Sequence, residues 1–235
     1  MKTINSQGII LSRTNYAEAD RILTILTPKY GKLRLIAKGV RKVKSKLAGG
    51  IELFSVSEIS YINGKREIGT LVSARLKTNY ATIVRDIERV QLGYELMRML
   101  NRVTEDHPEE LYFNILNSSF MALDNQEISR QLIYLWFMAQ LLKANGHSPN
   151  LLSDSSGQKL IETGYYSFDF DRMNFNAQAN GIYNARHIKL LRLLFGDYDI
   201  QKINNINNVE QYTAELKELM LAMSRDHLPQ LNNLR

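Results

Sequence analysis

The chain has 235 residues, of which 44% are hydrophobic and 23% charged, values that exclude a disordered or fibrous class. Its formal net charge at pH 7 is +6, and it contains no cysteine, which excludes thiol catalysis, disulfide bonds and thiolate zinc sites. This length suits one large domain or two modest ones. The longest strongly apolar stretch, 132–142, is shorter than the roughly 18 residues of a membrane span, so it predicts a buried helix.

The positive charge is concentrated in the first third of the chain. Residues 1–79 carry fifteen Lys plus Arg and five Asp plus Glu, a net +10, whereas residues 80–235 have a net charge of −4. A local positive field attracts polyanions, so the asymmetry indicates where a charged partner binds.

The hydrophobic pattern changes at the same place. Before residue 79, short runs rich in β-branched residues predict five strands, at 4–13, 21–27, 32–37, 51–62 and 69–76. After it, apolar residues recur at helical spacing in 83–100, 111–123, 128–142, 188–195 and 212–223. Residues 148–158, 165–181 and 201–208 interrupt this pattern with polar segments. We therefore expect an α+β protein with a β domain at 1–79 and a mostly α-helical domain at 80–235.

Five strands in about 75 basic residues favour an OB-fold barrel, with a small SH3-like barrel as the nearest alternative. The loop between the third and fourth strands, KGVRKVKSKLAGG at 38–50, has five cationic residues and no acidic one. Such a loop can neutralise phosphates without reading sequence. Four aromatic residues in or beside the strands could stack on bases, although at least half should be core: Tyr16, Tyr30, Phe54 and Tyr61.

The sequence gives only weak support for nucleotide binding, metal binding or nucleophilic catalysis. A phosphate-binding GxxxxGK[ST] loop would need glycines at the positions of Lys38 and Val43. Asp169 and Asp171 form a DxD that could bind a metal, but their alternation with phenylalanines also fits one short strand. The four histidines lack an HExxH pattern, and there is no GxSxG nucleophile elbow. The sequence therefore predicts no catalytic site, no cofactor and no enzyme.

Residues 8–59, GIILSRTNYAEADRILTILTPKYGKLRLIAKGVRKVKSKLAGGIELFSVSEI, closely resemble the N-terminal domain of the RecO family of bacterial DNA repair proteins. The resemblance rests on the pattern GxxLxRxxYxExDxxLxxLTxxxGKxxxxAKGxRxxKSxxxGxLxxF. It implies an OB-fold followed by a helical domain. It also implies a recombination mediator that binds single- and double-stranded DNA without sequence specificity and anneals complementary strands. The implied partners are RecR, the C-terminal tail of the single-stranded-DNA-binding protein and, indirectly, RecA, which is loaded onto coated DNA.

One region departs from the family pattern. Many RecO-like proteins carry two cysteine pairs that bind zinc after a GxxPxLxxC-type lead. Here Gly146, Pro149 and Gly157 remain, but Ser153 and Ser156 stand where the first pair would be. Because serine does not hold structural zinc, we expect no metal and expect 148–181 to be held by packing and hydrogen bonds.

We predict DNA annealing and mediation without covalent chemistry. The expected main phosphate contacts are Arg34, Lys38, Arg41, Lys42, Lys44 and Lys46, with Arg13, Arg21 and Lys32 as neighbours. An acidic partner tail would need an apolar pocket and a cation such as Arg130, Lys143 or Arg192 on the helical domain. The N-terminus lacks the apolar segment of a secretory signal, so we expect a cytoplasmic, nucleoid-associated protein and no membrane partner. The alternatives are an OB-fold RNA-binding module and a metal-dependent nuclease.

Overall fold

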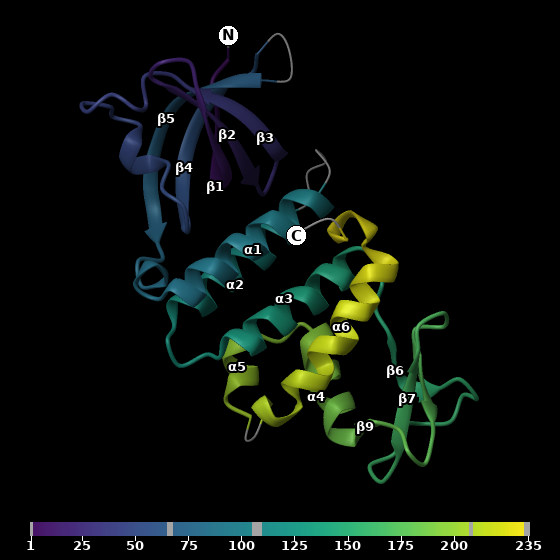
Figure 1. The fold of residues 1–235 in the computed structure, drawn as a ribbon. Coiled ribbons are helices and arrows are strands. Elements are labelled where there is room, and N and C mark those ends of the chain that lie inside the picture. Colours follow the sequence, from purple (N-terminus) through teal and green to yellow (C-terminus); the bar gives the residue numbers. More distant parts are fainter. Residues whose placement is uncertain (1, 65–67, 105–109, 207–208, 233–235) are drawn as a thin grey trace. The chain divides into compact units, whose positions relative to one another are not determined.

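The computed structural model describes the whole chain except residues 1, 65–67, 105–109, 207–208 and 233–235. The described residues form two compact units, Met1–Asn125 and Gln126–Arg235 (Figure 1). The first unit therefore contains two helices in addition to the five strands, and it ends after the point at which the sequence pattern changes from strand to helix.

The five N-terminal strands close into a barrel. They are β1 (Ile4–Tyr16), β2 (Asp20–Thr27), β3 (Gly31–Ala37), β4 (Ser55–Ile62) and β5 (Ile68–Asn79). Their order is β1-β2-β3-β5-β4, and β4 pairs with β1 to complete the circle. All pairings are antiparallel except that of β3 with β5, which is parallel. The prediction of a five-stranded OB-type barrel followed by a helical region, in a mixed α+β fold, is confirmed.

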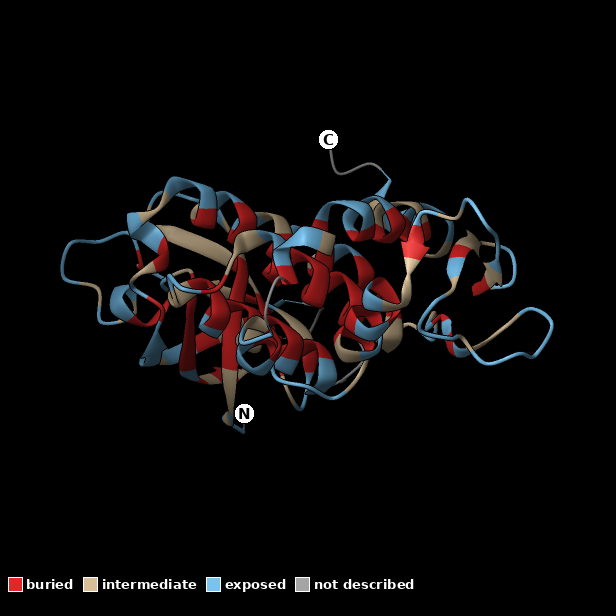
Figure 2. Cartoon of the chain, turned by 90° about the horizontal axis from the view of Figure 1, so that it is seen from below, coloured by how far each residue is buried: buried red, intermediate tan, exposed pale blue. Residues whose placement is uncertain are grey.

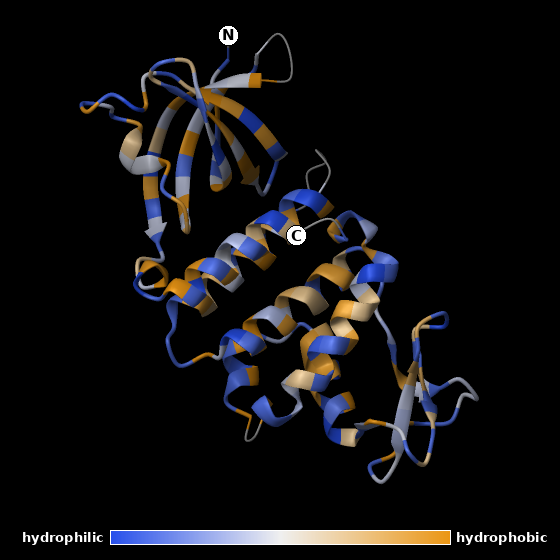
Figure 3. Cartoon of the chain, viewed as in Figure 1, coloured by the Kyte–Doolittle hydropathy of each residue, from blue (hydrophilic) through white to orange (hydrophobic). Residues whose placement is uncertain are grey.

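Alternating apolar residues in parts of the strands supply the interior of the barrel. Leu23 and Ile25 of β2, Leu35 of β3 and Ile59 of β4 are almost fully buried in one hydrophobic cluster, and the residues between them are more exposed. Figure 3 shows hydrophobic and hydrophilic residues following one another along the strands, and Figure 2 shows which segments of the chain are buried. Period-two burial of this kind gives each strand one face for the interior of the barrel.

Two helices pack within the same unit as the barrel, α1 (Ile87–Val103) and α2 (Glu110–Asp124), after a short 3₁₀ turn at Ile83–Arg85. The side chain of Asp86 begins α1 by accepting hydrogen bonds from the backbone N–H groups of Glu88 and Arg89. Gly93 of α1 lies directly against Phe54, since a Cβ at that position would be 2.5 Å from the ring. The helix can approach this ring so closely only because residue 93 has no side chain.

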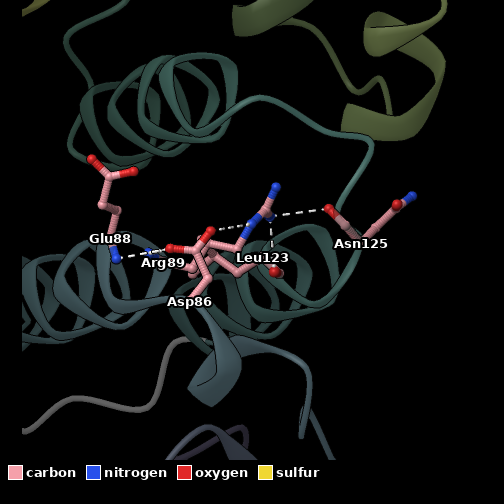
Figure 4. Close-up of polar contacts among 5 residues, drawn as sticks. All are labelled: Asp86, Glu88, Arg89, Leu123 and Asn125. Carbon is pink, nitrogen blue, oxygen red and sulfur yellow. Dashed lines mark hydrogen bonds and ion pairs between the residues drawn. The ribbon is translucent and has the colours of Figure 1, made fainter.

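Arg89 connects the start of α1 to the end of α2 (Figure 4). Its guanidinium is buried, and Nη1 donates hydrogen bonds to the carbonyl oxygens of Leu123 at 2.9 Å and Asn125 at 3.0 Å. Nε lies 3.7 Å from Oδ2 of Asp86. A cation at the C-terminal end of α2 meets carbonyl groups that the helix itself leaves without donors.

The second unit is built around α3 (Arg130–Ala144), whose residues from Leu132 to Leu142 are all buried. This confirms the predicted buried helix. Around it lie α4 (Ala185–Phe195), α5 (Ile200–Asn204), a 3₁₀ turn at Val209–Tyr212, α6 (Thr213–His227) and a last 3₁₀ turn at Pro229–Leu231. Among the residues that the structure describes, no helix combines the length and the apolar character needed to cross a membrane.

A small sheet interrupts the helices of the second unit. Its strands are β6 (Asn150–Asp154), β7 (Tyr165–Asp169), β8 (Asn174–Ala177) and β9 (Tyr183–Asn184), in the order β6-β8-β7-β9. The sequence predicts only polar interruptions here and not a sheet, because the strands are two to five residues long and rich in Asn and Asp. It also predicts a loop at 201–208, whereas α5 occupies the start of that segment.

Hydrogen bonds hold the loop in which the RecO pattern would place its first cysteine pair. Oδ1 of Asp154 accepts from Oγ of Ser156 at 2.7 Å and from the N–H groups of Ser156 and Gln158, both at 2.9 Å. These donors, the Ser156 hydroxyl foremost, lower the pKa of the Asp154 carboxyl. Ser153 likewise accepts a bond from the Asn150 amide at 3.1 Å. Both serines therefore take part in a hydrogen-bonded loop, which is the kind of support expected from the sequence.

Candidate nucleic-acid interface

The basic loop joins β3 to β4 and extends from the barrel (Figure 1). It contains two consecutive turns, in which the N–H of Lys42 bonds to the carbonyl of Gly39 at 3.1 Å and the N–H of Ser45 to that of Lys42 at 3.0 Å. Val40 before the tip is buried in the barrel core, and Leu47 after it packs against the same core. The tip is thus held between two hydrophobic anchors.

The base of the loop is also fixed to the turn between β1 and β2. Oδ1 of Asp20 accepts a hydrogen bond from the N–H of Gly39 at 2.7 Å, and Gly39 has a φ of +65°, which favours glycine. Arg41 donates its backbone N–H to the carbonyl of Ala19 at 2.9 Å and its Nη1 to the carbonyl of Glu18 at 3.1 Å. These contacts were not expected from the sequence, because they join residues about twenty positions apart.

Five of the nine cations expected to contact phosphate make no side-chain hydrogen bond or ion pair within the described residues. All five are exposed: Arg34, Lys38, Lys42, Lys44 and Lys46. Four lie on the loop, and Arg34 lies on the outer face of β3. Their charges are free to meet a ligand at this end of the barrel.

The other four expected contacts already have partners within the chain, and Arg41 is one of them. Arg13 donates to the carbonyl of Ile51 at 3.3 Å and lies 3.7 Å from Glu52, and Arg21 donates to Asn15 at 3.1 Å.

Lys32 has a structural role that the sequence did not reveal. Its Nζ donates to the carbonyl oxygens of Asn101 at 3.0 Å and Thr104 at 2.7 Å, at the C-terminal end of α1. There the ammonium group satisfies helix carbonyls and complements the helix dipole. Lys32 therefore links β3 to α1, and its charge is directed away from the basic loop.

The four aromatic residues separate into two pairs. Tyr61 and Phe54 are buried, at 1% and 3% exposure, whereas Tyr16 is 50% and Tyr30 41% exposed. Tyr16 ends β1 opposite Asp20, beside the turn that supports the basic loop. Tyr30 lies in the turn between β2 and β3 and packs edge-on against Tyr61, with ring centroids 6.1 Å apart. Only Tyr16 of the exposed pair adjoins the loop.

A polar hollow of about 940 Å³ lies between the outer face of the barrel and α2. The cations on its lining, Lys29 and Arg75, are matched in number by the carboxylates of Glu58 and Glu110. Arg75 lies 2.6 Å from Glu58 and lowers the pKa of that carboxyl, mainly by hydrogen bonding. The charges cancel, so this hollow is a poor site for a phosphate polymer.

A second hollow, of about 380 Å³, lies on the second unit and was not expected from the sequence. Its lining combines apolar residues of α4 and of the segment before α6 with two cations of α4. The lining residues are Arg186, Lys189, Leu190, Leu193, Ile206, Val209 and Tyr212. Arg186 donates to the hydroxyl of Tyr212 at 2.7 Å, and Lys189 contacts Glu162 at 2.5 Å. An apolar hollow with cations in its lining suits an acidic peptide that carries apolar side chains.

The expected cations for such a peptide lie elsewhere in the second unit. Lys143 contacts Asp197 at 2.7 Å, and Arg192 donates twice to the carbonyl of Leu151, at 2.7 and 2.9 Å. Arg130 stands at the first position of α3. None of the three lines the hollow.

The DxD pair belongs to a tight turn. β7 ends at Asp169, whose Oδ1 accepts a hydrogen bond from the N–H of Arg172 at 3.0 Å. In the part of the chain that the structure describes, no three His, Cys, Asp or Glu side chains gather as a metal site would require. Asp169 thus stabilises the turn between β7 and β8.

A closed five-stranded barrel of this strand order, with a cationic loop at one end, places the first unit in the OB-fold class. Comparison with known proteins narrows this class. The family model described as Recombination protein O N terminal matches residues 1–80, and Recombination protein O C terminal matches 84–235. The chain therefore belongs to the RecO family and has a role in DNA repair and recombination.

Three relatives illustrate the similarity, and each is described as DNA repair protein RecO. The protein from Alkaliphilus metalliredigens is 30% identical over 151 residues, covering 64% of this chain and 61% of that protein. The protein from Dehalococcoides mccartyi is 32% identical over 179 residues, covering 75% and 67%. The protein from Prosthecochloris aestuarii is 27% identical over 253 residues, covering 99% and 96%. The first alignment thus spans less than two thirds of that relative.

Proposed function

We propose that the chain is a non-enzymatic recombination mediator that binds single- and double-stranded DNA through the basic loop and anneals complementary strands. The observation that carries the proposal is the combination of a fixed loop base with the free lysines Lys38, Lys42, Lys44 and Lys46. Such lysines can neutralise phosphates on two strands while leaving the base edges free to pair. Tyr16, exposed beside the loop, could supply a plane for one base.

The test is a variant in which these four lysines become alanine and Arg41 is retained, so that the loop keeps its support. Each phosphate contact on single-stranded DNA contributes about 0.7 to the slope of log K against log salt. We expect the slope to fall by about three units, with weaker binding to both single strands and duplex. An unchanged slope would contradict the assignment.

A matched control separates this effect from overall charge. Lys42→Ala with Lys44→Ala and Lys159→Ala with Lys202→Ala change the net charge equally, but the second pair lies on the second unit. Only the first pair should reduce the slope. Matched DNA and RNA oligonucleotides distinguish a DNA mediator from the RNA-binding alternative, in which RNA would bind more tightly.

The mediator activity itself is tested by annealing. We propose that RecR assists the chain on DNA coated with its single-stranded-DNA-binding protein, and that RecA loading follows. The lysine variant should anneal coated strands more slowly than the unmodified chain, both with and without RecR. Magnesium-dependent cleavage of labelled DNA that is lost in Asp171→Asn would instead support the nuclease alternative.

We place the acidic tail of the single-stranded-DNA-binding protein in the second hollow, which Arg186 and Lys189 line together with apolar residues. A fluorescent peptide with several aspartates and an apolar C-terminal residue serves as the probe. Lys189→Glu should weaken binding about tenfold or more, because it replaces an attractive charge with a repulsive one. Lys143→Glu makes the same charge change away from the hollow and should have little effect. Equal losses in the two variants would exclude this location.

We place the protein in the cytoplasm with its DNA.

A further inference from the structure

The tip of the basic loop carries an apolar residue that phosphate binding does not explain. Val43 is 104% exposed, the highest value among the described large hydrophobic residues that are exposed, followed by Leu152 at 75%. A single exposed apolar residue is ordinary on a protein surface. This one stands between Lys42 and Lys44, at the centre of the densest cationic run of the chain.

The backbone presents this side chain in a defined way. Val43 is the second residue of the turn closed by the bond from the Ser45 N–H to the Lys42 carbonyl at 3.0 Å. The preceding turn is fixed through Gly39 to Asp20, and Val40 is held in the core. Valine also has a single side-chain torsion with a strong preference, so it loses little conformational entropy on binding. The tip is an apolar projection on a supported base.

A nucleic acid offers two kinds of surface to such a tip. The flanking lysines can bind the phosphates of the backbone, and the valine between them can pack against the apolar face of a base. In a duplex the base faces are stacked and covered, whereas in a single strand they can be reached. Apolar side chains can enter between the stacked bases of a duplex only by unstacking them, which costs free energy, so an already unstacked single strand is the more favourable partner.

We propose that Val43 is a base-contacting residue that packs against the face of an unstacked base in single-stranded DNA. Its contribution persists at high salt and favours single strands over duplex, and this inference rests on the proposed DNA-binding function. The contact adds no sequence preference, because every base has an apolar face.

The experiment compares the full chain with Val43→Ser and Lys44→Ala on a fluorescent oligothymidylate and on a duplex, across a range of salt concentrations. Val43→Ser should bind the single strand about tenfold more weakly, as expected for partial loss of one buried valine side chain. Its salt slope and its duplex affinity should not change. Lys44→Ala should instead lower the slope by about 0.7 on the single strand. Because Val43 has no packing contacts to lose, circular dichroism should show both variants folded.

Single-strand binding by Val43→Ser that equals that of the unmodified chain at every salt concentration would overturn the inference. Equal losses on single strand and duplex would also overturn it, because they would indicate a general change in the loop. Failure of the proposed function gives a different result: the unmodified chain would show no salt-dependent DNA binding, or Lys44→Ala would leave the slope unchanged. Val43→Leu supplies the opposite perturbation and should tighten single-strand binding.

Discussion

Replacing Arg89 by methionine tests whether the contact between α1 and α2 stabilises the first unit. Methionine keeps an unbranched stem of similar length but removes the guanidinium, so the carbonyl groups of Leu123 and Asn125 lose the hydrogen bonds from Nη1. Hydrogen bonds to a charged donor each contribute about 1.5 to 3 kcal/mol. Asp86 adds little, because its side chain is one-third exposed and 3.7 Å away.

The expected loss in the free energy of unfolding is therefore about 3 to 6 kcal/mol, the sum for two such hydrogen bonds. Urea denaturation followed by circular dichroism measures it. Hydrogen exchange of the α2 amides shows whether the loss lies in the first unit. Arg225→Met removes an exposed arginine from α6 and serves as the control. A change in Arg89→Met within about 1 kcal/mol of that control would refute the reasoning.

Three further predictions concern single positions. Lys32→Met should destabilise the first unit by about 1 to 2 kcal/mol in urea denaturation, because two carbonyls at the end of α1 lose their donor. Gly50→Ala should lower the thermal midpoint of the first unit, because a Cβ at Gly50 would lie 2.2 Å from the carbonyl oxygen of Ala74, and an unchanged midpoint would contradict the close approach. The carboxyl pKa of Asp154 is lowered on folding, so its contribution to stability is present above the unfolded pKa and is lost as pH falls through the folded value. Exchange of the Ser156 amide should quicken over that acidic range relative to the intrinsic rate, and in Asp154→Ala it should be fast at every pH.

The barrel could be predicted because its strands are short runs rich in β-branched residues, and several of them alternate apolar and polar residues in the sequence itself. Leu23 and Ile25 or Leu33 and Leu35 mark their strands without any knowledge of the partner strand. The longer helices were visible because their apolar residues recur at helical spacing, whereas the short helix α5 was not. The small sheet was not, because its strands are short and the packing of Phe175 against neighbouring rings depends on segments distant in sequence.

The candidate interface could be predicted only in part. The density of positive charge predicted a phosphate-binding site at 38–46. Whether a given cation is available to a ligand, however, depends on which groups of the folded chain lie within hydrogen-bonding distance of it. Lys32 and Lys38 are six residues apart and look equivalent in the sequence, yet the first binds the carbonyl ends of α1 and the second has no side-chain partner among the described residues. The hydrogen bond that Asp20 accepts from Gly39 could not be predicted either, because nothing in the sequence near Asp20, at the start of β2, indicates a donor nineteen residues away.

The residues of the basic loop differ in how firmly they are held, and this difference affects how tightly the proposed DNA-binding loop would hold a strand. Arg41 bonds to the carbonyl of Glu18 and helps fix the loop base, whereas Lys42, Lys44 and Lys46 keep their rotamer freedom. A long side chain that loses about 2 kcal/mol of rotamer entropy on binding makes only a weak net contact with a phosphate. Several such contacts together still supply affinity, but each can break and re-form on a neighbouring phosphate. Under the proposed function, strands held in this way would slide past each other until their bases pair.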